Sequence, residues 1–267
     1  MTRIMLLYKN IVPILRQTHK NLKYKAPAKA DFADAIHWTP LAGTEYYQAA
    51  RHYPILFMSN LGSDDKPIYA SVALLGLANN ENDYLNADKT WAKNAYIPAF
   101  IRRYPFILAE NEDPKDLSVC IDDQSGCFNE IDGIPLFNET GDISPFLEER
   151  IAFLNTFKNS MNDTAAFLKT LEKMDLLIKR SVNVETNIGY QARLEDFWMV
   201  NEEKFGKLSG DQLAKLHKRG FLGWIIAHLM SLNNLPPLLQ RRIEHKQGEN
   251  TKGESSADTS IQSPVLN

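Results

Sequence analysis

The sequence predicts an α+β fold, with a mostly antiparallel sheet built around a duplicated helix-strand-strand unit and a C-terminal helical lobe. The main observation is a segment that occurs twice, at residues 51–57 and 102–108, as a basic pair, Tyr-Pro and an apolar run. Each run is short for a helix and suits a buried strand. Since the residue before a proline avoids helical conformation, each copy marks a change from helix to strand.

The duplicated unit covers about residues 42–77 and 96–121. In each copy a short helix leads into the Tyr-Pro strand, and a polar loop leads into a second apolar strand. Such internal similarity indicates that one packing solution is used twice. The short connections favour antiparallel pairing. The expected helices are at 42–51 and 96–103, and the expected second strands are at 68–77 and 117–121.

The chain divides into three parts by pattern and composition. Residues 1–143 are expected to form the mixed α/β part that holds the duplication. Residues 144–246 are expected to add a long helix, a hairpin and C-terminal helices packed on the same core. Ser144 suits the N-cap of the long helix and Pro145 its first turn. Residues 247–267 are polar with few apolar groups, which predicts a disordered tail.

The later elements have local signals of their own. Residues 178–184 alternate between apolar and polar, and residues 190–200 are a second candidate strand, with Gly189 at the turn between them. The order Ser, Gly, Asp, Gln at residues 209–212 is typical of a capping box. Gly220 is suited to end the helix that begins there.

Composition places the chain among globular proteins and excludes some functions. It has 267 residues, of which 44% are hydrophobic and 24% charged, enough to bury a substantial core. A net charge of -3 gives no electrostatic basis for binding nucleic acid. The N-terminal residues 3–9 are too short for a signal peptide core and predict a first strand. The most apolar helix, 221–232, is too short to span a bilayer.

Two cysteines, Cys120 and Cys127, provide no disulfide framework and fit a reducing cytoplasm. A single bridge between them is the alternative. Acidic residues and glycines between 122 and 142 could hold Ca²⁺ or Mg²⁺, but the ligand spacing of a calcium loop is missing. The bland interpretation is a solvated loop, and we expect no metal and no cofactor.

No catalytic motif is visible. The six histidines show no metal-site spacing, and the chain lacks a nucleophile elbow, a phosphate-binding glycine loop and a dinucleotide fingerprint. This absence favours a non-catalytic role without excluding an enzyme.

The best candidates for a binding site are the repeated basic and aromatic residues. A guanidinium group binds carboxylates through two hydrogen bonds, and tyrosine adds a flat surface with a polar end. A symmetric pocket of this kind would suit a peptide terminus or an acidic side chain. The alternative, which we favour, is that the arginines meet the negative ends of helix dipoles while the tyrosines pack under the sheet. The residues concerned are Arg51, Tyr53, Arg102, Arg103 and Tyr104.

Two histidines near the C-terminus form a second candidate pair. His217 and His228 flank Gly220 and could face each other across a helix corner, for proton transfer or as ligands. The alternative, again favoured, is a buried histidine bound to a backbone carbonyl. We also expect Trp224 and His228 to share one helix face, because they are four residues apart.

Three strings identify a relationship to a known family. The chain resembles the bacterial SapC family over residues 1 to about 245. The strings are Leu216-His217-x-x-Gly220-x-Leu222-x-x-Ile225-x-Ala227-His228-Leu229-x-Ser231-Leu232-x-Asn234, Tyr96-x-Pro98-x-Phe100-x-Arg102-Arg103-Tyr104-Pro105-Phe106 and Val119-Cys120-Ile121-Asp122.

The resemblance implies a soluble protein linked by name to surface-layer secretion. Similar chains are often encoded beside TonB-dependent receptors, cupin-like oxygenases and flavin-dependent halogenase-like proteins. A peptide-transporter permease shares the name, but a permease requires membrane spans that this sequence does not show.

Three functional hypotheses remain. The first is a non-catalytic accessory or adaptor protein that binds a peptide, a protein or a transport component. The second is an enzyme, or an enzyme subunit, acting with an oxygenase or halogenase-like partner on a peptide or aromatic substrate. The third, a structural surface-layer role, is disfavoured by the missing secretion signal. We expect a protein or peptide partner, no nucleic acid and no membrane span; the sequence leaves the oligomeric state open.

Overall fold

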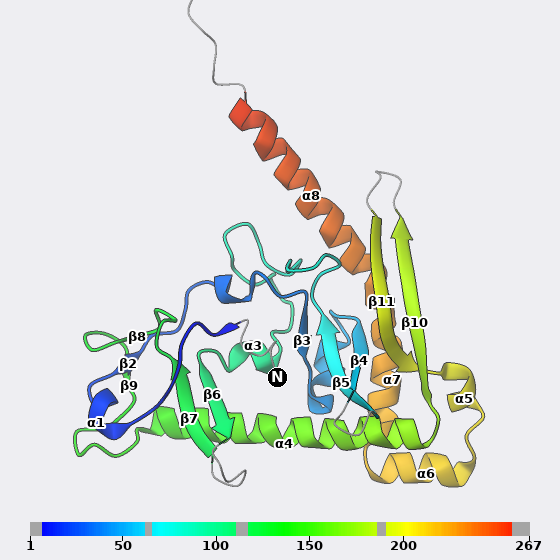
Figure 1. Cartoon of the computed structure of the whole chain (residues 1–267), viewed down its shortest axis with the longest axis horizontal. Helices are drawn as coiled ribbons and strands as arrows, with labels where there is room; N and C mark the ends of the chain where they lie inside the picture. The colour runs from blue at the N-terminus through cyan, green and yellow to red at the C-terminus, as the bar shows by residue number, and fades with distance from the viewer. Residues whose placement is uncertain (1–6, 62–65, 111–116, 186–190, 258–267) are drawn as a thin grey trace, which may run out of the picture.

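A computed structural model describes residues 7–61, 66–110, 117–185 and 191–257. The described chain forms three antiparallel sheets and a set of helices, which confirms the α+β prediction. Two of the sheets stand side by side, and the third is a small sheet at one end (Figure 1).

The larger sheet has five strands in the order β10-β11-β4-β5-β3, and all neighbours are antiparallel. Its centre is the hairpin of β4 and β5, in which Phe57 pairs with Ser71. Both faces of this hairpin carry buried apolar residues, with Ile55 and Phe57 on one face and Leu56 and Val72 on the other. The strands are β3 (Trp38–Pro40), β4 (Ile55–Leu61), β5 (Pro67–Leu74), β10 (Leu177–Glu185) and β11 (Gln191–Val200).

The second sheet has the order β1-β7-β6, and the small third sheet has the order β8-β2-β9. The second sheet is built on the hairpin of β6 and β7, in which Leu108 pairs with Val119. The strands of these two sheets are β1 (Ile11–Pro13), β6 (Phe106–Glu110), β7 (Leu117–Asp122), β2 (Lys23–Tyr24), β8 (Phe128–Asn129) and β9 (Ile134–Pro135).

The predicted helix-strand-strand unit occurs twice. In the first copy, the 3-10 turn η3 (Gly43–Glu45) and helix α2 (Tyr46–Ala49) lead into β4 and β5. In the second copy, helix α3 (Ala99–Arg102) leads into β6 and β7. The copies lie in different sheets, so the duplication builds two neighbouring hairpins and not one continuous sheet.

Helix α4 (Pro145–Lys173) supports both hairpins. It runs along the base of the molecule and contacts β5 of one sheet and β6 of the other (Figure 1). Its start is the predicted one, because the Ser144 hydroxyl accepts a hydrogen bond from the Leu147 amide, 3.3 Å away. One face of α4 is buried over its whole length, at Leu147, Leu154, Phe157, Thr164, Phe167, Leu168 and Leu171.

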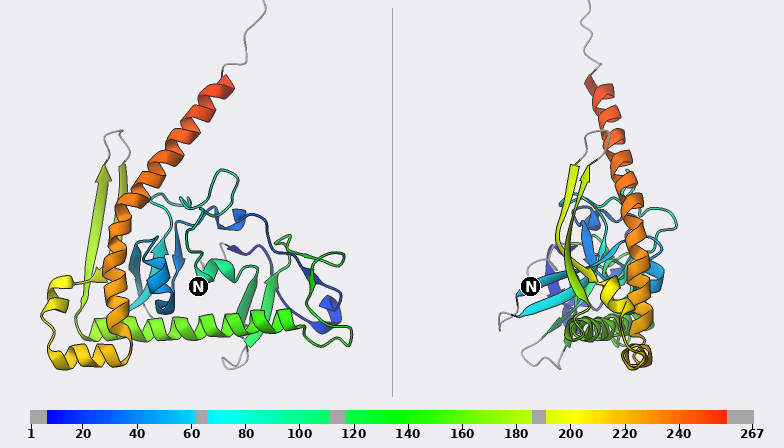
Figure 2. Two further views of the ribbon diagram at one scale, coloured as in Figure 1. Left: turned by 180° about the vertical axis from the view of Figure 1, so that it is seen from behind. Right: turned by 90° about the vertical axis from the view of Figure 1, so that its right-hand side faces the viewer.

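The C-terminal lobe is helical, as predicted. Ser209 and Gln212 form the expected capping box, and Gly220 adopts a positive φ of 74° between two helices. The last helix projects away from the body in both views of Figure 2. The remaining helices and 3-10 turns are α1 (Arg16–His19), η2 (Asp31–Ala33), α5 (Glu202–Gly206), α6 (Gly210–Lys218), α7 (Phe221–Ser231), η4 (Leu232–Asn234) and α8 (Leu235–Ala257).

The N-terminal prediction needs correction. Residues 1–6 lie outside the described part of the chain, and residues 7–9 are not in a strand, which begins only at Ile11. The amides of Lys9 and Asn10 donate instead to the buried Asp122 carboxylate, each at 2.9 Å. Because a side chain satisfies these amides, no strand pairing is needed there.

The tail prediction also differs from the structure. Helix α8 continues to Ala257, so residues 247–257 are helical, and residues 258–267 lie outside the described part of the chain. The predicted hairpin of β10 and β11 is present, while its expected turn residue Gly189 is not among the described residues. No helix within the described ranges is both long and apolar enough to cross a bilayer.

Two glycines allow α2 and its preceding turn to lie close to α7. A Cβ atom on Gly43 would be 2.4 Å from the ring of Trp224, and one on Gly223 would be 2.0 Å from the Tyr47 hydroxyl oxygen. The Trp224 ring also packs on Phe167 of α4, at 5.4 Å between ring centroids. The absence of a side chain at Gly43 thus brings the first copy, the base helix and the helical lobe together.

We predict that Gly43→Ala lowers the free energy of unfolding by about 1–3 kcal/mol, because the added methyl group overlaps a ring packed on other rings. Urea unfolding followed by circular dichroism measures the change. Gly210→Ala is the matched control, since nothing lies within 4 Å of a Cβ there and alanine favours the helix. Equal losses in the two variants would contradict the close approach.

Candidate functional site

The first Tyr-Pro copy is anchored by Tyr53, which is fully buried. Its hydroxyl donates to the carbonyl oxygen of Tyr96 and accepts from the Trp91 ring nitrogen at 3.1 Å. Its ring packs on Tyr84, with 4.4 Å between centroids. Burial raises the pKa of Tyr53 far above its usual range. Arg51, two residues earlier, is exposed.

The second copy has different surroundings. The Tyr104 hydroxyl donates to the Asp122 carboxylate at 3.1 Å, and its ring stacks on Phe32 at 4.0 Å. The Arg103 guanidinium lies 4.0 Å from the centre of the Phe100 ring. Its Nε and Nη2 atoms are buried and have no hydrogen-bond partner among the described residues. Burial lowers the pKa of Arg103, against the opposing effect of Tyr8.

Arg102 is exposed but fixed by hydrogen bonds. Its Nε donates to the Ile97 carbonyl at 2.9 Å, and its Nη2 donates to the Tyr96 hydroxyl at 3.1 Å. That hydroxyl donates to the Glu45 carboxylate at 2.9 Å, which also accepts from the Ala99 amide at 2.7 Å. Burial raises the pKa of Glu45 even though these donors favour its charged form.

The five predicted residues have different sets of neighbours, some of which they share. Tyr53 and Arg102 bind the same neighbour, Tyr96, whereas Tyr104 binds Asp122. Arg103 lies over an aromatic ring, and Arg51 is on the surface. Their role in binding a partner stays a prediction.

The two predicted histidines also differ. His217 is exposed on α6, whereas His228 of α7 is fully buried. The His228 Nε2 atom accepts a hydrogen bond from the Val200 amide at 3.1 Å, so a neutral ring carries its proton on Nδ1. The ring stacks on Phe57, with centroids 4.5 Å apart. Burial lowers the pKa of His228 to about 3, against a smaller raising effect of the Ile55 backbone.

His228 begins a row of three polar residues along α7 and η4. The Ser231 hydroxyl accepts from the Ile55 amide at 2.9 Å. The Asn234 side-chain amide donates to the carbonyl oxygens of Ala50 at 2.8 Å and Tyr53 at 3.2 Å. Ser231 and Asn234, which belong to one of the strings that carry the family resemblance, thus bind the backbone of the first Tyr-Pro copy directly. This role is structural.

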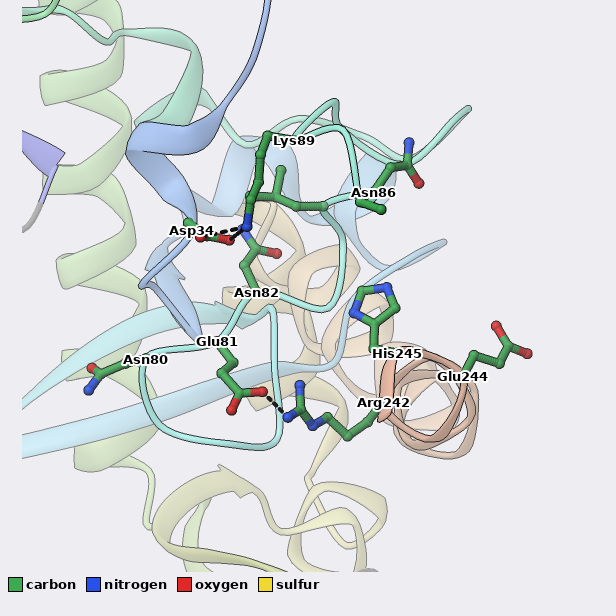
Figure 3. Close-up of a pocket in the computed structure, with 11 residues that line it drawn as sticks. Asp34, Asn80, Glu81, Asn82, Asn86, Lys89, Arg242, Glu244 and His245 are labelled. Atoms are coloured by element: carbon green, nitrogen blue, oxygen red, sulfur yellow. Dashed lines mark hydrogen bonds and ion pairs between the residues drawn. The ribbon is translucent and has the colours of Figure 1, made fainter. Parts of the chain in front are cut away.

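A polar pocket of about 580 Å³ lies between the loop that follows β5 and helix α8 (Figure 3). One wall holds an ion pair in which the Lys89 Nζ atom lies 2.7 Å from the Asp34 carboxylate, and both side chains are nearly half-exposed. The opposite wall holds Arg242 and His245 of α8, and Glu81 lies between the walls. The pocket therefore offers charged groups of both signs to a ligand.

Arg242 fixes the α8 side of this pocket. It is 2% exposed and forms ion pairs with Glu81 and with the fully buried Asp83, the latter at 3.0 Å. His245 lies one turn further along, with its Nδ1 atom 3.6 Å from the Asp83 carboxylate. The Asp83 carboxylate also accepts from the Leu77 amide at 3.3 Å. These bonds join α8 to the loop, so the pocket wall is pre-formed.

Sequence reasoning did not single out the pocket residues. One signal was present: Leu238 and Arg242 are four residues apart and share a helix face, and Leu238 is fully buried. An arginine that continues an apolar stripe indicates a buried ion pair. No signal pointed to Asp34 or Lys89, because nothing in the sequence places these two loops together.

A comparison with protein families gives one match. The model of the family described as SapC matches residues 14–238, most of the chain. The chain belongs to the SapC family. Neither the curated proteins nor the solved structures contain a match. The SapC match ends before Arg242 and His245, so it covers the loop side of the polar pocket and stops short of its α8 side.

Metal ligands do not gather in this SapC family member within the ranges that the structure describes. No group of three His, Cys, Asp or Glu side chains there could hold an ion. Cys120 and Cys127 are both buried free thiols. Burial is the main cause that raises the pKa of each thiol, so neither is activated as a nucleophile.

We predict that His228 makes stability depend on pH. Its folded-state pKa lies below the unfolded value, so its contribution is complete above about pH 6.5 and falls as the pH drops toward 3. Between pH 6.5 and 5 the protein should lose about 2 kcal/mol through this group. Urea unfolding of His228→Gln should show a weaker pH dependence than the parent chain. Identical pH profiles would contradict a buried neutral ring.

We also predict different effects for the two neighbouring arginines. Arg103→Ala should lower the free energy of unfolding by about 1–3 kcal/mol, because the side chain packs among buried aromatic rings. Arg102→Ala should cost about 0.5–1.5 kcal/mol, the value of an ordinary hydrogen-bonded side chain. Chemical denaturation of both variants under one condition provides the comparison, and a larger loss for Arg102→Ala would refute it.

Proposed function

We propose that this protein is a non-catalytic accessory protein that binds a positively charged peptide segment in the polar pocket. The observation that carries this proposal is the fixed set of accessible acidic groups around the pocket. The side chains of Asp34 and Glu81 are 49% and 42% exposed to solvent, and Glu244 is exposed. Arg242 is buried against Glu81 and Asp83, so its charge is already compensated.

The charge balance favours a cationic ligand. Three acidic residues line the pocket against two that are permanently basic, and the buried Asp83 adds a further negative charge below. A lysine or arginine side chain of a peptide could take the place of Lys89 at Asp34, or bind either Glu81 or Glu244. Charge-assisted hydrogen bonds of this kind are stronger than neutral ones.

The remaining lining suits a peptide backbone. Asn80 and Asn86 each offer an amide that both donates and accepts, which matches the groups of an extended chain. None of the residues that line the pocket is a serine, threonine or cysteine, so the pocket supplies no hydroxyl or thiol nucleophile of those types. The two asparagine amides support a role in binding a peptide.

The cellular setting is part of the same proposal. We place the protein in the cytoplasm, supported by its two free thiols, which fit a reducing compartment. The resemblance stated for the sequence adds an association with surface-layer or TonB-dependent uptake systems. The peptide segment would then belong to a protein of such a system.

The test uses isothermal titration calorimetry with two capped pentapeptides, acetyl-Ala-Lys-Ala-Lys-Ala-amide and its glutamate counterpart. The lysine peptide should bind, and Glu244→Lys should weaken binding about tenfold, or ~1.4 kcal/mol. Glu139→Lys, an equal charge change on an exposed loop far along the chain, should leave binding unchanged.

Binding should also weaken as salt rises, since the groups concerned are partly exposed. Equal binding of the two peptides, or no heat with millimolar lysine peptide, would refute the proposal. Mass spectrometry of the recovered peptide adds a separate check, because chemical conversion would replace the binding role with the enzyme alternative.

A further inference from the structure

Strand β11 contains a β-bulge. Arg180 of β10 pairs with Phe197, and Val182 pairs with Leu194, so the two residues between them on β11 face the single Ser181. One of these two, Asp196, has a left-handed φ of 57°. Its amide donates to the Ser181 hydroxyl at 3.3 Å. A bulge adds one residue to a strand and redirects the side chains beyond it.

The bulge places Leu194 and Phe197 on the same side of the hairpin. In a regular strand, residues three apart point to opposite faces. Because one extra residue lies between them here, both side chains line one pocket with β4 and β5. The strand irregularity therefore completes an apolar wall that a regular β11 would leave open.

The floor of this pocket is one face of the five-stranded sheet. Leu56 pairs with Val72, and Trp38 pairs with Leu74, so the register puts all four side chains on the same face. Leu56, Val72 and Leu74 are at most 3% exposed. The pocket has a volume of about 260 Å³. Concave pockets lined by apolar side chains and a few polar groups are the usual sites of small ligands.

Part of the pocket lining is polar. His37, Asn79 and Glu195 line the pocket together with the apolar residues. The His37 Nδ1 atom accepts from the Asn80 amide at 3.4 Å, which leaves the proton of a neutral ring on Nε2. A ligand with an apolar body and one polar edge would match this arrangement.

We propose that this pocket binds a small aromatic compound of two fused rings with one uncharged hydrogen-bonding group at its edge. A cavity of about 150 Å³ holds a single benzene ring, so the larger volume suits a second ring. Trp38 and Phe197 line the pocket and supply aromatic groups for contact. The Glu195 carboxylate in the lining disfavours a negatively charged edge group. No residue lines both this pocket and the polar pocket, so the two proposals stand separately.

The test is a titration of the whole chain with 2-naphthol, in which isothermal titration calorimetry measures the binding. We expect saturable binding of one molecule per chain. Phenol, with one ring, and 2-naphthoate, with an anionic edge, should each bind at least about tenfold more weakly. Absence of 2-naphthol binding at its solubility limit would overturn the proposal, as would equal affinity for 2-naphthoate.

Two pairs of variants locate the site. Met58→Trp fills the pocket and should weaken 2-naphthol binding at least about tenfold, whereas Met230→Trp, on the exposed side of α7, should leave it unchanged. Deletion of Asp196 removes the bulge and should abolish binding, whereas Asp196→Gly keeps the left-handed residue and should preserve it. Circular dichroism confirms that each variant is folded. Unchanged binding in folded Met58→Trp would overturn the assignment.

Discussion

The structure depends on the hydrogen bonds that α7 and η4 make to buried backbone groups of two strands. Strands β11 and β4 share one paired position, Trp198 with Phe57, so the ladder between them is short. The His228 ring accepts a hydrogen bond from the Val200 amide at the end of β11. The Ser231 hydroxyl accepts one from the Ile55 amide at the start of β4. Buried amides without partners are costly. The helix therefore supplies what the ladder lacks and holds the β10–β11 hairpin on the sheet.

The loop after β5 determines where both pockets lie. It folds back tightly at Gly76, where a Cβ atom would be 2.1 Å from the Glu81 carbonyl oxygen. This return places Asn79 in the apolar pocket and Asn80 in the polar one. The bonds from Asp83 to Leu77 and Arg242 hold the loop in that form. A substitution in this short segment therefore acts on both sites.

Glu45, Arg242 and Arg103 show three ways in which the fold holds a charged side chain away from solvent. Glu45 is bound by amide and hydroxyl donors, Arg242 by two carboxylates, and Arg103 lies over an aromatic ring. Removing one partner of a buried pair is costly because it leaves the other charge uncompensated. Two of these charges, Glu45 and Arg103, belong to the duplicated part of the chain, where the sequence alone suggested a binding site.

Local patterns in the sequence were sufficient for the fold class and for most elements. The Tyr-Pro segments predicted both hairpins, Ser144 predicted the start of α4, and Gly220 predicted a helix end, because each signal acts within a few residues. The prediction of a first strand at residues 3–9 was wrong because Asp122, far along the chain, accepts hydrogen bonds from the Lys9 and Asn10 amides. That competition has no local signal.

The sequence by itself determined the family, the helix-strand-strand unit and the burial of Tyr53 and Tyr104. Only the tertiary structure decided that the two copies lie in separate sheets and that His217 and His228 do not share an environment. It also brought Asp34, Glu81 and Arg242 to one pocket from three distant segments. The physical reason is range: caps, turns and alternation act between near neighbours, whereas pockets and buried ion pairs form between segments that meet only when the core closes.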